Sequence, residues 1–528
     1  MDNGSRYAIG QQDFSILREE DAYYADKTPY IAKIIRSRSK YYLLARPRRF
    51  GKSLFLSTLR YFFEGRKELF KGLFIESVEW DWETYPVLHL DLNTDRYDEP
   101  GLLENVLDNR FRSWEEKYGL IGSSTGMAPS LINLSSRFAN IIAAAHKQTG
   151  KPVVILVDEY DKPLVGNLNK NENFEHYRTK LASLYSNFKS SAEHIRLVFL
   201  TGVSRFSKLS VFSDLNNLED ISFDNDFADI CGITETELHN IFQSGIKKLA
   251  DIESVSFREA CELLKEHYDG YKFTVNGSDI YNPWSLLNAL KKSEIINYWN
   301  QTGKPTIVAE ALKSMDVNLE ETLTTQCDMN TLAGLDIHSL DPIPLMYQTG
   351  YITIKGYDRQ TRLLTLGIPN REVRDGIFKE LLPLYVKVRR GNAESTIRNI
   401  INSILNGKPT DFMRYLEAFM AGIPYDLRMD NENNFQNAIY ILLSLIGINT
   451  KVEERTSAGR IDLSIETSKY IYIIELKYDG SPQKALAQIN EKGYTRKYLT
   501  DHRKIFKIGA SFSVKTRTIE NCVIEEEK

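Results

Sequence analysis

The chain has 528 residues, of which 42% are hydrophobic and 26% are charged, and its formal net charge is −4. This length predicts two or three domains, and this charge excludes a protein whose whole surface is a basic lining for nucleic acid. The four cysteines lie far apart without a zinc pattern, and no signal core or long apolar run is present, so we expect a cytoplasmic protein without a membrane segment.

The first motif along the chain is a basic loop between a predicted strand and a predicted helix. The apolar run 41–45 leads into Arg46-Pro-Arg-Arg-Phe-Gly-Lys-Ser53, and an apolar helical pattern follows. In such a loop, backbone N–H groups and a helix N-terminus surround a phosphate, Lys52 reaches the outer phosphates, and Ser53 offers its hydroxyl to Mg²⁺. The general pattern begins with glycine, whereas this chain has Arg46, and Pro47 lacks an N–H. A basic turn is the alternative for this motif alone.

The second motif is an acidic pair at the end of a buried strand. The run 153–157 is continuously apolar, as in a central parallel strand, and Asp158 and Glu159 follow it. Asp158 can hold Mg²⁺, and Glu159 can polarise the water that attacks the γ-phosphate. Either motif alone fits a solvated loop, but the two in this order predict a site for ATP and Mg²⁺. We expect Asp161 to cap the short helix that follows, with a catalytic role as the alternative.

Residues 1–225 alternate between strands and helices, which predicts a P-loop parallel sheet with helices on both faces. Thr201 ends the last predicted strand, where it can either sense the γ-phosphate or cap the strand. Arg205 follows it, and an arginine at this place can complete the nucleotide site of a neighbouring copy in a homo-oligomer. The predicted strands are 41–45, 87–92, 153–157 and 197–200, and the predicted helices include 131–145 and 173–190.

Residues 226–395 are predicted to be mostly helical and to form a lid with a winged-helix-like part. A helix at 343–347 precedes a hairpin made of 351–354 and 363–366. The helix before this wing has no face rich in Lys or Arg. We therefore favour a packing role for this region over DNA binding.

Residues 396–528 are predicted to form a separate α/β domain that carries a second polar cluster. Asp462 lies early in one short predicted strand, and Glu475 and Lys477 lie in the next. If the strands pair as a hairpin, the two carboxylates converge, and residues 475 and 477 share a face because side chains alternate with period two. Gln488 on a following helix and Glu432 at the start of an earlier helix complete the set.

This second cluster suits hydrolysis of phosphodiester bonds. Asp462 and Glu475 would bind Mg²⁺, which lowers the pKa of bound water and stabilises charge on the scissile phosphate. Lys477 would position the nucleophile or neutralise the phosphate. Residues 451–528 contain 15 Lys and Arg against 12 Asp and Glu, a local surplus of three, so we expect DNA or RNA as the partner. A solvated ion pair is the alternative for a Glu-x-Lys strand by itself.

Together, these segments resemble a bacterial and archaeal family that joins an AAA-ATPase-like P-loop domain to a C-terminal PD-(D/E)xK nuclease-superfamily domain. The family's phosphate loop also lacks the first glycine. Where the family often has Pro before the metal-binding Asp, this chain has Ile461. The resemblance implies a restriction-endonuclease-like α/β fold for the last domain. The matching motifs are Tyr24-Ala-Asp-Lys-Thr28, Arg46-Pro-Arg-Arg-Phe-Gly-Lys-Ser53, Asp158-Glu-Tyr-Asp161, Thr201-Gly-Val-Ser-Arg205, Tyr268-Asp-Gly-Tyr271, Asn282-Pro283, Gly367-Ile-Pro-Asn370, Gly459-Arg-Ile-Asp462 and Glu475-Leu-Lys477 with Gln488.

Two functions of different class follow from these features. In the first, the protein is an ATP-dependent nuclease whose nucleotide state controls access of a polynucleotide to the second cluster. In the second, it is an ATP-driven switch or scaffold whose nuclease-like domain only binds nucleic acid or protein. The candidate nucleotide-binding residues are Arg48, Arg49, Phe50, Gly51, Lys52, Ser53, Asp158, Thr201 and Arg205. The candidate catalytic residues are Glu159, Asp462, Glu475, Lys477 and Gln488, and the candidate metal ligands are Ser53, Asp158, Glu432, Asp462 and Glu475.

Overall fold

The chain folds into two compact units, and each is interrupted in sequence. Unit 1 contains Met1–Trp299 and Gln326–Glu372, and unit 2 contains Asn300–Thr325 and Val373–Lys528. Each unit includes segments of the expected middle region, whose boundaries at 225 and 395 stay predictions. The computed structural model describes residues 6–120, 133–167, 171–205, 212, 215, 217–299, 308, 312, 319–334, 341–385, 390–421, 437, 439–442, 449–456, 459–513 and 518–527.

Unit 1 is built on a parallel sheet with the strand order β2-β3-β4-β1-β5. The three central strands are almost entirely buried, which accounts for their continuous apolar sequences. Strand β4 lies between β3 and β1, and in register Leu44 pairs with Thr201 while Val157 pairs with Leu200. The carboxyl ends of all three strands therefore meet at one edge. The strands are β1 (Tyr41–Ala45), β2 (Val87–Asp91), β3 (Val153–Asp158), β4 (Ile195–Gly202) and β5 (Glu219–Asp220).

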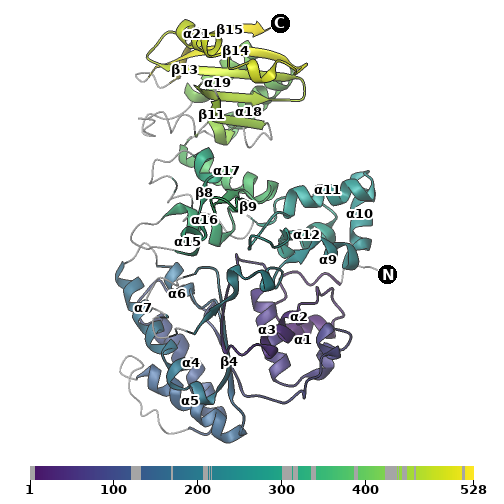
Figure 1. The fold of residues 1–528 in the computed structure, drawn as a ribbon, viewed down its shortest axis with the longest axis vertical. Coiled ribbons are helices and arrows are strands. Elements are labelled where there is room, and N and C mark those ends of the chain that lie inside the picture. The colour runs from purple at the N-terminus through teal and green to yellow at the C-terminus, as the bar shows by residue number, and fades with distance from the viewer. Residues whose placement is uncertain are drawn as a thin grey trace. The chain divides into compact units, whose positions relative to one another are not determined.

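Helices cover both faces of this sheet, as the sequence predicts (Figure 1). One group comprises α1 (Phe14–Glu19), α2 (Thr28–Arg36) and α3 (Lys52–Phe63). The other comprises α4 (Leu102–Lys117), α5 (Leu134–Thr149), α6 (Lys162–Val165) and α7 (Asn171–Tyr185), followed by α8 (Asn187–Ser190). The single helix predicted over 173–190 is thus two helices.

The rest of unit 1 is mostly helical, with short strands. A capping box joins Thr234 and Glu237 at the start of α9, as its Thr-x-x-Glu sequence predicts. The hairpin of β9 and β10 follows α16 as expected, and β8 adds a third strand that the sequence analysis did not predict. The elements are β6 (Ile233–Thr234), α9 (Glu235–Ile241), α10 (Gln243–Glu253), α11 (Phe257–Tyr268), β7 (Ile280–Tyr281), α12 (Pro283–Lys292), β8 (Gln326–Cys327), α15 (Met329–Ala333), α16 (Pro342–Thr349), β9 (Thr353–Tyr357) and β10 (Leu364–Gly367).

Unit 2 contains a mixed five-stranded sheet with the order β11-β12-β13-β14-β15. Strands β13 and β14 are parallel, and the other neighbours are antiparallel. The chain enters the unit for the second time along α17 (Arg371–Tyr385), whose first two residues are the last two of unit 1. The other elements are α14 (Leu319–Leu323), α18 (Arg390–Leu405), α19 (Pro409–Ala421), β11 (Asn449–Thr456), β12 (Gly459–Glu466), β13 (Tyr470–Tyr478), α21 (Pro482–Lys492), β14 (Lys504–Ser513) and β15 (Thr518–Glu527).

Alternation along β13 assigns its side chains to two different layers. Tyr472 donates a hydrogen bond to the carbonyl of Ile404 in α18, on one face. Ile471 and Ile473 form a hydrophobic cluster with Ile489 of α21, on the other. Since residues 475 and 477 have the same parity as 471 and 473, β13 presents them toward α21.

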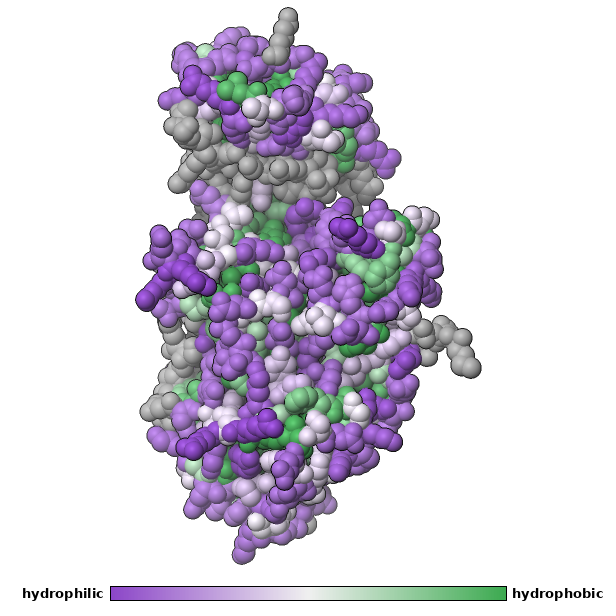
Figure 2. Space-filling model, turned by 45° about the vertical axis from the view of Figure 1, so that its right-hand side comes forward, coloured by the Kyte–Doolittle hydropathy of each residue, from purple (hydrophilic) through white to green (hydrophobic). Residues whose placement is uncertain are grey.

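The surface in view is mostly hydrophilic, with hydrophobic side chains in small, separate patches (Figure 2). This distribution is ordinary for a globular chain. Within the described part of the chain, no helix combines the length and apolarity needed to cross a bilayer.

Candidate functional site

The phosphate loop predicted from the sequence connects β1 to α3. Arg49 and Gly51 adopt left-handed backbone conformations with φ of 68° and 94°, which turn the chain sharply into the first turn of α3. The Lys52 side chain is buried at that turn. Its Nζ donates to the carbonyl of Pro47 at 3.2 Å and lies 3.4 Å from Oε1 of Glu159. The ammonium group is therefore held between the loop and the acidic pair that follows β3.

The ends of β3 and β4 are joined by a direct side-chain contact. The hydroxyl of Thr201 donates a hydrogen bond to Oδ1 of Asp158, and both residues are buried. Glu159 has a φ of 51°, so its backbone bends directly after Asp158 and directs its carboxylate to Lys52. The structure thus brings together Lys52, Asp158, Glu159 and Thr201.

Asp91 is a further acid at this edge that the sequence analysis did not select. It is the last residue of β2 and pairs in register with Asp158. The available signal was an acid at the second-last position of the predicted strand 87–92, close to the strand-end signal that identified Asp158. A second carboxylate beside Asp158 can receive hydrogen bonds from metal-bound water.

The missing first glycine of the loop has a structural explanation. Arg46 is 2% exposed, and its guanidinium donates to the carbonyls of Ala45, Ser222 and Phe227 at 3.0, 2.7 and 3.1 Å. It also stacks on the ring of Phe273 at 4.3 Å. Arg46 therefore points away from the loop's anion face and fastens its base to later segments of unit 1.

Asp161 does not have the role predicted for it. It stands at the N-cap position of α6, but its side chain makes no capping hydrogen bond. Instead, its carboxylate accepts from the backbone N–H groups of Val203 and Ser204 at 3.1 and 2.6 Å. Burial, followed by the charge of Glu159, raises the pKa of Asp161 to about 6. Asp161 fixes the turn after β3 to the chain after β4, which holds Thr201 beside Asp158.

The remaining loop residues have different environments. Phe50 is buried, with its ring edge-on to Tyr271 at 4.8 Å. The guanidinium of Arg49 stacks on Trp284 at 4.3 Å. Arg48 is exposed, and Ser53 is half-buried in the first turn of α3. The Phe50 ring therefore packs into the protein.

Arg205 is engaged within its own chain. Its guanidinium pairs with Asp220 at 2.5 Å and stacks on Phe223 at 4.4 Å. The prediction that it completes a neighbouring copy's site requires it to leave Asp220.

In unit 2, the predicted carboxylates and lysine do converge. Strands β12 and β13 pair as an antiparallel hairpin with Leu463 opposite Ile474, and one further step places Asp462 opposite Glu475. Oδ2 of Asp462 accepts from the backbone N–H of Leu476 at 2.7 Å. The Lys477 ammonium lies 3.5 Å from Oε1 of Glu475.

Gln488 joins this cluster from α21. Its amide oxygen accepts from Nζ of Lys477 at 2.6 Å, and its amide nitrogen donates to Oε1 of Glu475. The same nitrogen is 3.5 Å from the hydroxyl of Tyr494, a contact that the sequence analysis missed. Tyr494 lies in the loop after α21, where a tyrosine gives no distinctive sequence signal.

The close approach of α21 to the sheet depends on Gly509. This residue pairs with Glu475 across β13 and β14. A Cβ at Gly509 would lie 2.2 Å from the carbonyl oxygen of Pro482 and 2.5 Å from the nitrogen of Leu486. Only glycine lets the helix backbone rest on the strand here, and this contact brings Gln488 within reach of Glu475.

Glu475 has the properties expected of a metal ligand. It is 2% exposed, and its Oε2 is buried without a hydrogen-bond partner. Burial, followed by the nearby charge of Asp462, raises the pKa of Glu475 to about 7. A bound cation would stabilise the charged form of Glu475 against both its burial and the repulsion from Asp462.

In the nuclease-like site, the described residues offer a metal ion two carboxylates, those of Asp462 and Glu475. Among all the described residues, no cluster of three or more His, Cys, Asp or Glu side chains is arranged to hold a metal ion. Mg²⁺ commonly uses one or two carboxylates and completes its shell with water and substrate phosphate, so Asp462 and Glu475 fit it. Glu432, the third predicted ligand, lies outside the described residues.

Comparison with known proteins agrees with this arrangement. The family described as "Predicted AAA-ATPase" matches residues 8–212, and the "PD-(D/E)XK nuclease superfamily" matches residues 430–522. A relative from Azotobacter chroococcum mcd 1, described as "Uncharacterized protein in vnfD 5'region", is 34% identical over 532 residues that cover 98% of each chain. The chain belongs to this AAA-ATPase-like/PD-(D/E)XK family. The predicted fusion and fold class are thereby confirmed, and the relative's description assigns no activity.

Three family motifs outside both sites contact one another behind the phosphate loop. The N–H of Asn282 donates to the carbonyl of Tyr268 at 3.0 Å. The Asn370 amide donates to the carbonyl of Asp269 at 2.8 Å. Since Phe50 packs on Tyr271, the motifs 268–271, 282–283 and 367–370 form one layer against the loop.

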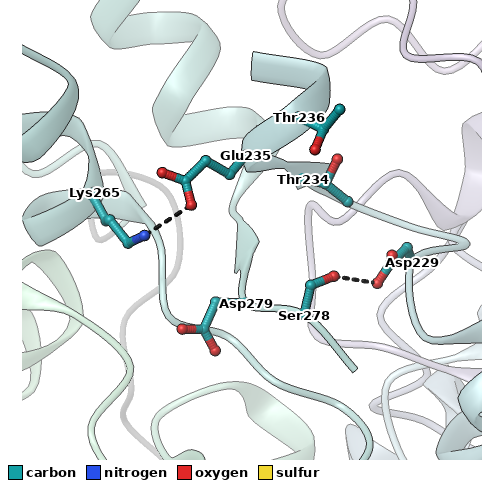
Figure 3. Close-up of a pocket in the computed structure, with 7 residues that line it drawn as sticks. All are labelled: Asp229, Thr234, Glu235, Thr236, Lys265, Ser278 and Asp279. Carbon is teal, nitrogen blue, oxygen red and sulfur yellow. Dashed lines mark hydrogen bonds and ion pairs between the residues drawn. The ribbon is translucent and has the colours of Figure 1, made fainter. Parts of the chain in front are cut away.

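A polar pocket of about 490 Å³ lies in unit 1, beside the motifs 24–28 and 268–271 rather than at the phosphate loop: Lys27 donates to the carbonyl of Asp229 in its lining, and Tyr271 pairs with Ile280 next to Asp279 (Figure 3). Two of its carboxylates have partners within the lining, Glu235 with Lys265 at 2.9 Å and Asp229 with Ser278 at 2.9 Å. We assign it no part in nucleotide binding. The lining residues are Asp229, Thr234, Glu235, Thr236, Lys265, Ser278 and Asp279.

Proposed function

We propose that this protein binds and hydrolyses ATP in unit 1 and cleaves polynucleotide phosphodiester bonds in unit 2, with cleavage under nucleotide control. The proposal rests on two clusters, one in each unit. For the nuclease reaction, the decisive observation is the buried, unpartnered Oε2 of Glu475 beside Asp462. A buried carboxylate oxygen in that state is stabilised by a divalent cation, since the Lys477 ammonium, 3.5 Å away, contacts only the other oxygen, Oε1.

In the ATP site, Lys52 would exchange the carbonyl of Pro47 and the carboxylate of Glu159 for the outer phosphates. Ser53 and Asp158 would hold Mg²⁺, which neutralises phosphate charge when bound. Glu159, once released from Lys52, would orient the attacking water. Thr201 would keep Asp158 in place, because its hydroxyl already donates to that carboxylate.

In the nuclease site, Asp462 and Glu475 would hold Mg²⁺, which activates water and stabilises the charge of the scissile phosphate when bound. Lys477 would neutralise that phosphate, since its ammonium is partly exposed beside Glu475. Gln488 would fix the positions of both side chains through the two hydrogen bonds it makes with them.

The nuclease half is tested by Mg²⁺-dependent digestion of plasmid, single-stranded DNA and RNA. We expect wild-type protein to cleave at least one of them, and Glu475→Ala to abolish that cleavage. Glu104→Gln, a change at a buried carboxylate of unit 1, is the control for general damage. Equal digestion by wild type and Glu475→Ala would exclude this site as the catalyst.

The ATPase half is tested by phosphate release from ATP. We expect Lys52→Ala to lose ATP binding and Glu159→Gln to bind ATP but turn it over at least about 100-fold more slowly. Unchanged turnover in both variants would refute the assignment.

A switch or scaffold is the second candidate function. It is favoured by the mutual pairing of Lys477, Gln488 and Glu475, which together satisfy most of the polar groups of the site without a metal. ATP-dependent assembly in size-exclusion chromatography, without cleavage of any polynucleotide, would support it. In either case we propose a cytoplasmic location, since the four cysteines are free thiols.

A further inference from the structure

One buried carboxylate behind the phosphate loop is used by neither proposed site. Glu372 is 0% exposed and lies in the first turn of α17, two residues after the motif 367–370. Its Oε1 accepts from the backbone N–H groups of Tyr298 and Trp299, at 2.5 and 2.9 Å. Its Oε2 is buried and receives no hydrogen bond of good geometry, although the Ser285 hydroxyl lies close enough to act on the carboxylate.

The position of Glu372 along the chain gives these hydrogen bonds a consequence. The chain leaves unit 1 for unit 2 after Trp299 and again after Glu372. The carboxylate therefore bonds one exit of the chain to the other. If the carboxylate becomes a weaker acceptor, the hydrogen bonds that hold residues 298–299 to residue 372 weaken, and these are the two places where the chain leaves unit 1.

Arg49 of the phosphate loop is the cation that acts on Glu372. Its Nη1 is buried without a hydrogen-bond partner, while its guanidinium stacks on Trp284. Burial raises the pKa of Glu372 to about 7, although the Ser285 hydroxyl, the N–H groups of Trp299 and Tyr298 and the charge of Arg49, in that order, favour the charged form. The two side chains, both within the described residues, form no ion pair. The other ionisable groups that act with Glu372 are three tyrosines whose pKa is raised by burial: Tyr268, Tyr271 and Tyr298.

Arg49 is half-buried and Glu372 is fully buried, and their opposite charges act on each other without forming an ion pair. Each unsatisfied buried polar group costs about 1–3 kcal/mol, more if it is charged. If ATP binds in the loop as proposed, Arg49 faces two anions, a phosphate and the carboxylate of Glu372, whose charge already acts on it. It cannot satisfy both equally.

We propose that the nucleotide phosphates and Glu372 compete for Arg49, so that ATP in the loop weakens the bond that Glu372 makes between the two exits of unit 1. This inference rests on the proposed ATP site and gives nucleotide control a physical route. A phosphate draws the guanidinium away through a charge-assisted hydrogen bond. Glu372 then loses its cation and takes up a proton more readily. A neutral carboxyl accepts more weakly than a carboxylate from Tyr298 and Trp299.

Linkage makes the effect reciprocal, which provides the test. If Glu372 competes with phosphate, removing its charge must tighten ATP binding. We expect Glu372→Gln, which keeps an oxygen acceptor for the two N–H groups, to bind a fluorescent ATP analogue about fivefold more tightly, or more. Glu104→Gln, at a buried carboxylate that bonds His176 instead, should bind as wild type does.

The fluorescence of Trp299 can show whether ATP in the phosphate loop affects the hydrogen bonds that Glu372 makes. The Trp299 ring lies 5.0 Å from that of Tyr351, and its emission is isolated by subtracting the spectrum of Trp299→Phe. We expect ATP to change this emission in wild type and in Glu104→Gln, but not in Glu372→Gln. A structural role alone would lower stability without removing the ATP response.

Hydrogen exchange of the Tyr298 and Trp299 amides in wild type needs no substitution at Glu372. We expect ATP to accelerate it about threefold or more, whether or not Glu372→Gln folds. The inference would be overturned, with the proposed ATP site left standing, if ATP binds but leaves the exchange of these amides unchanged. It would also be overturned if Glu372→Gln and wild type bind ATP with equal affinity and show the same Trp299 response. Failure of wild type to bind ATP would overturn the proposed ATP site together with it.

Discussion

The substitution Gly509→Ala tests whether α21 positions the nuclease site. Its Cβ would lie 2.2 Å from the Pro482 carbonyl oxygen, whereas ordinary contacts of this kind begin at 3.4 Å. The helix must therefore move away from β14 by about 1 Å, at an overpacking cost of about 1–3 kcal/mol. The same movement stretches the 2.6 Å contact between Gln488 and Lys477 beyond hydrogen-bond range.

We expect two measurements to change together in Gly509→Ala. Urea unfolding should show the loss of stability, and cleavage of a labelled oligonucleotide should slow by about 10- to 100-fold, because misplacement by about 1 Å is costly for catalysis. Gly356→Ala is the matched control, since its Cβ would meet Thr365 at an ordinary 3.6 Å. A less stable protein that still cleaves at the wild-type rate would refute the claim that α21 positions the site.

Three other predictions concern unit 1. Thr201→Val should lower the unfolding free energy by about 1–2 kcal/mol and slow ATP turnover, because Asp158 loses its hydroxyl donor; unchanged turnover would contradict this role. Arg46→Gly, although it restores the general loop pattern, should cost about 3 kcal/mol in urea unfolding, since four carbonyls, that of Ala228 at 3.5 Å included, lose a donor. Equal or greater stability would be the contrary result. Glu372 has a pKa of about 7 in the folded protein against an ordinary 4.5, so the stability it contributes is present below about pH 4.5 and falls by up to about 3 kcal/mol as pH rises to about 7; comparison of unfolding against pH should show a flatter profile for Glu372→Gln.

The sequence predicted best those features that depend on the residues of a single strand. The runs 153–157 and 41–45 predict their strands because parallel strands buried on both faces are continuously apolar. In unit 2, period-two alternation correctly places Glu475 and Lys477 on one face of β13. These are local rules, and they needed no knowledge of distant segments.

Other features depend on contacts between distant residues and could not be predicted in this way. Arg46 could be recognised only as a departure from the general loop pattern that the family shares, because its partners Ser222 and Phe227 lie far along the chain. Asp161 looked like a helix cap, because the N–H groups that it accepts from belong to the chain after β4. The approach of α21 to Gly509 is likewise a tertiary contact that leaves no periodic pattern.

The central claim is that nucleotide in unit 1 governs cleavage in unit 2. The most direct measurement is the initial rate of Mg²⁺-dependent cleavage of one labelled polynucleotide, with and without ATP, in wild type and in Lys52→Ala. We predict that ATP changes the rate in wild type and has no effect in Lys52→Ala, while Glu475→Ala is inactive in both conditions. Cleavage that is identical with and without ATP in wild type would contradict the account.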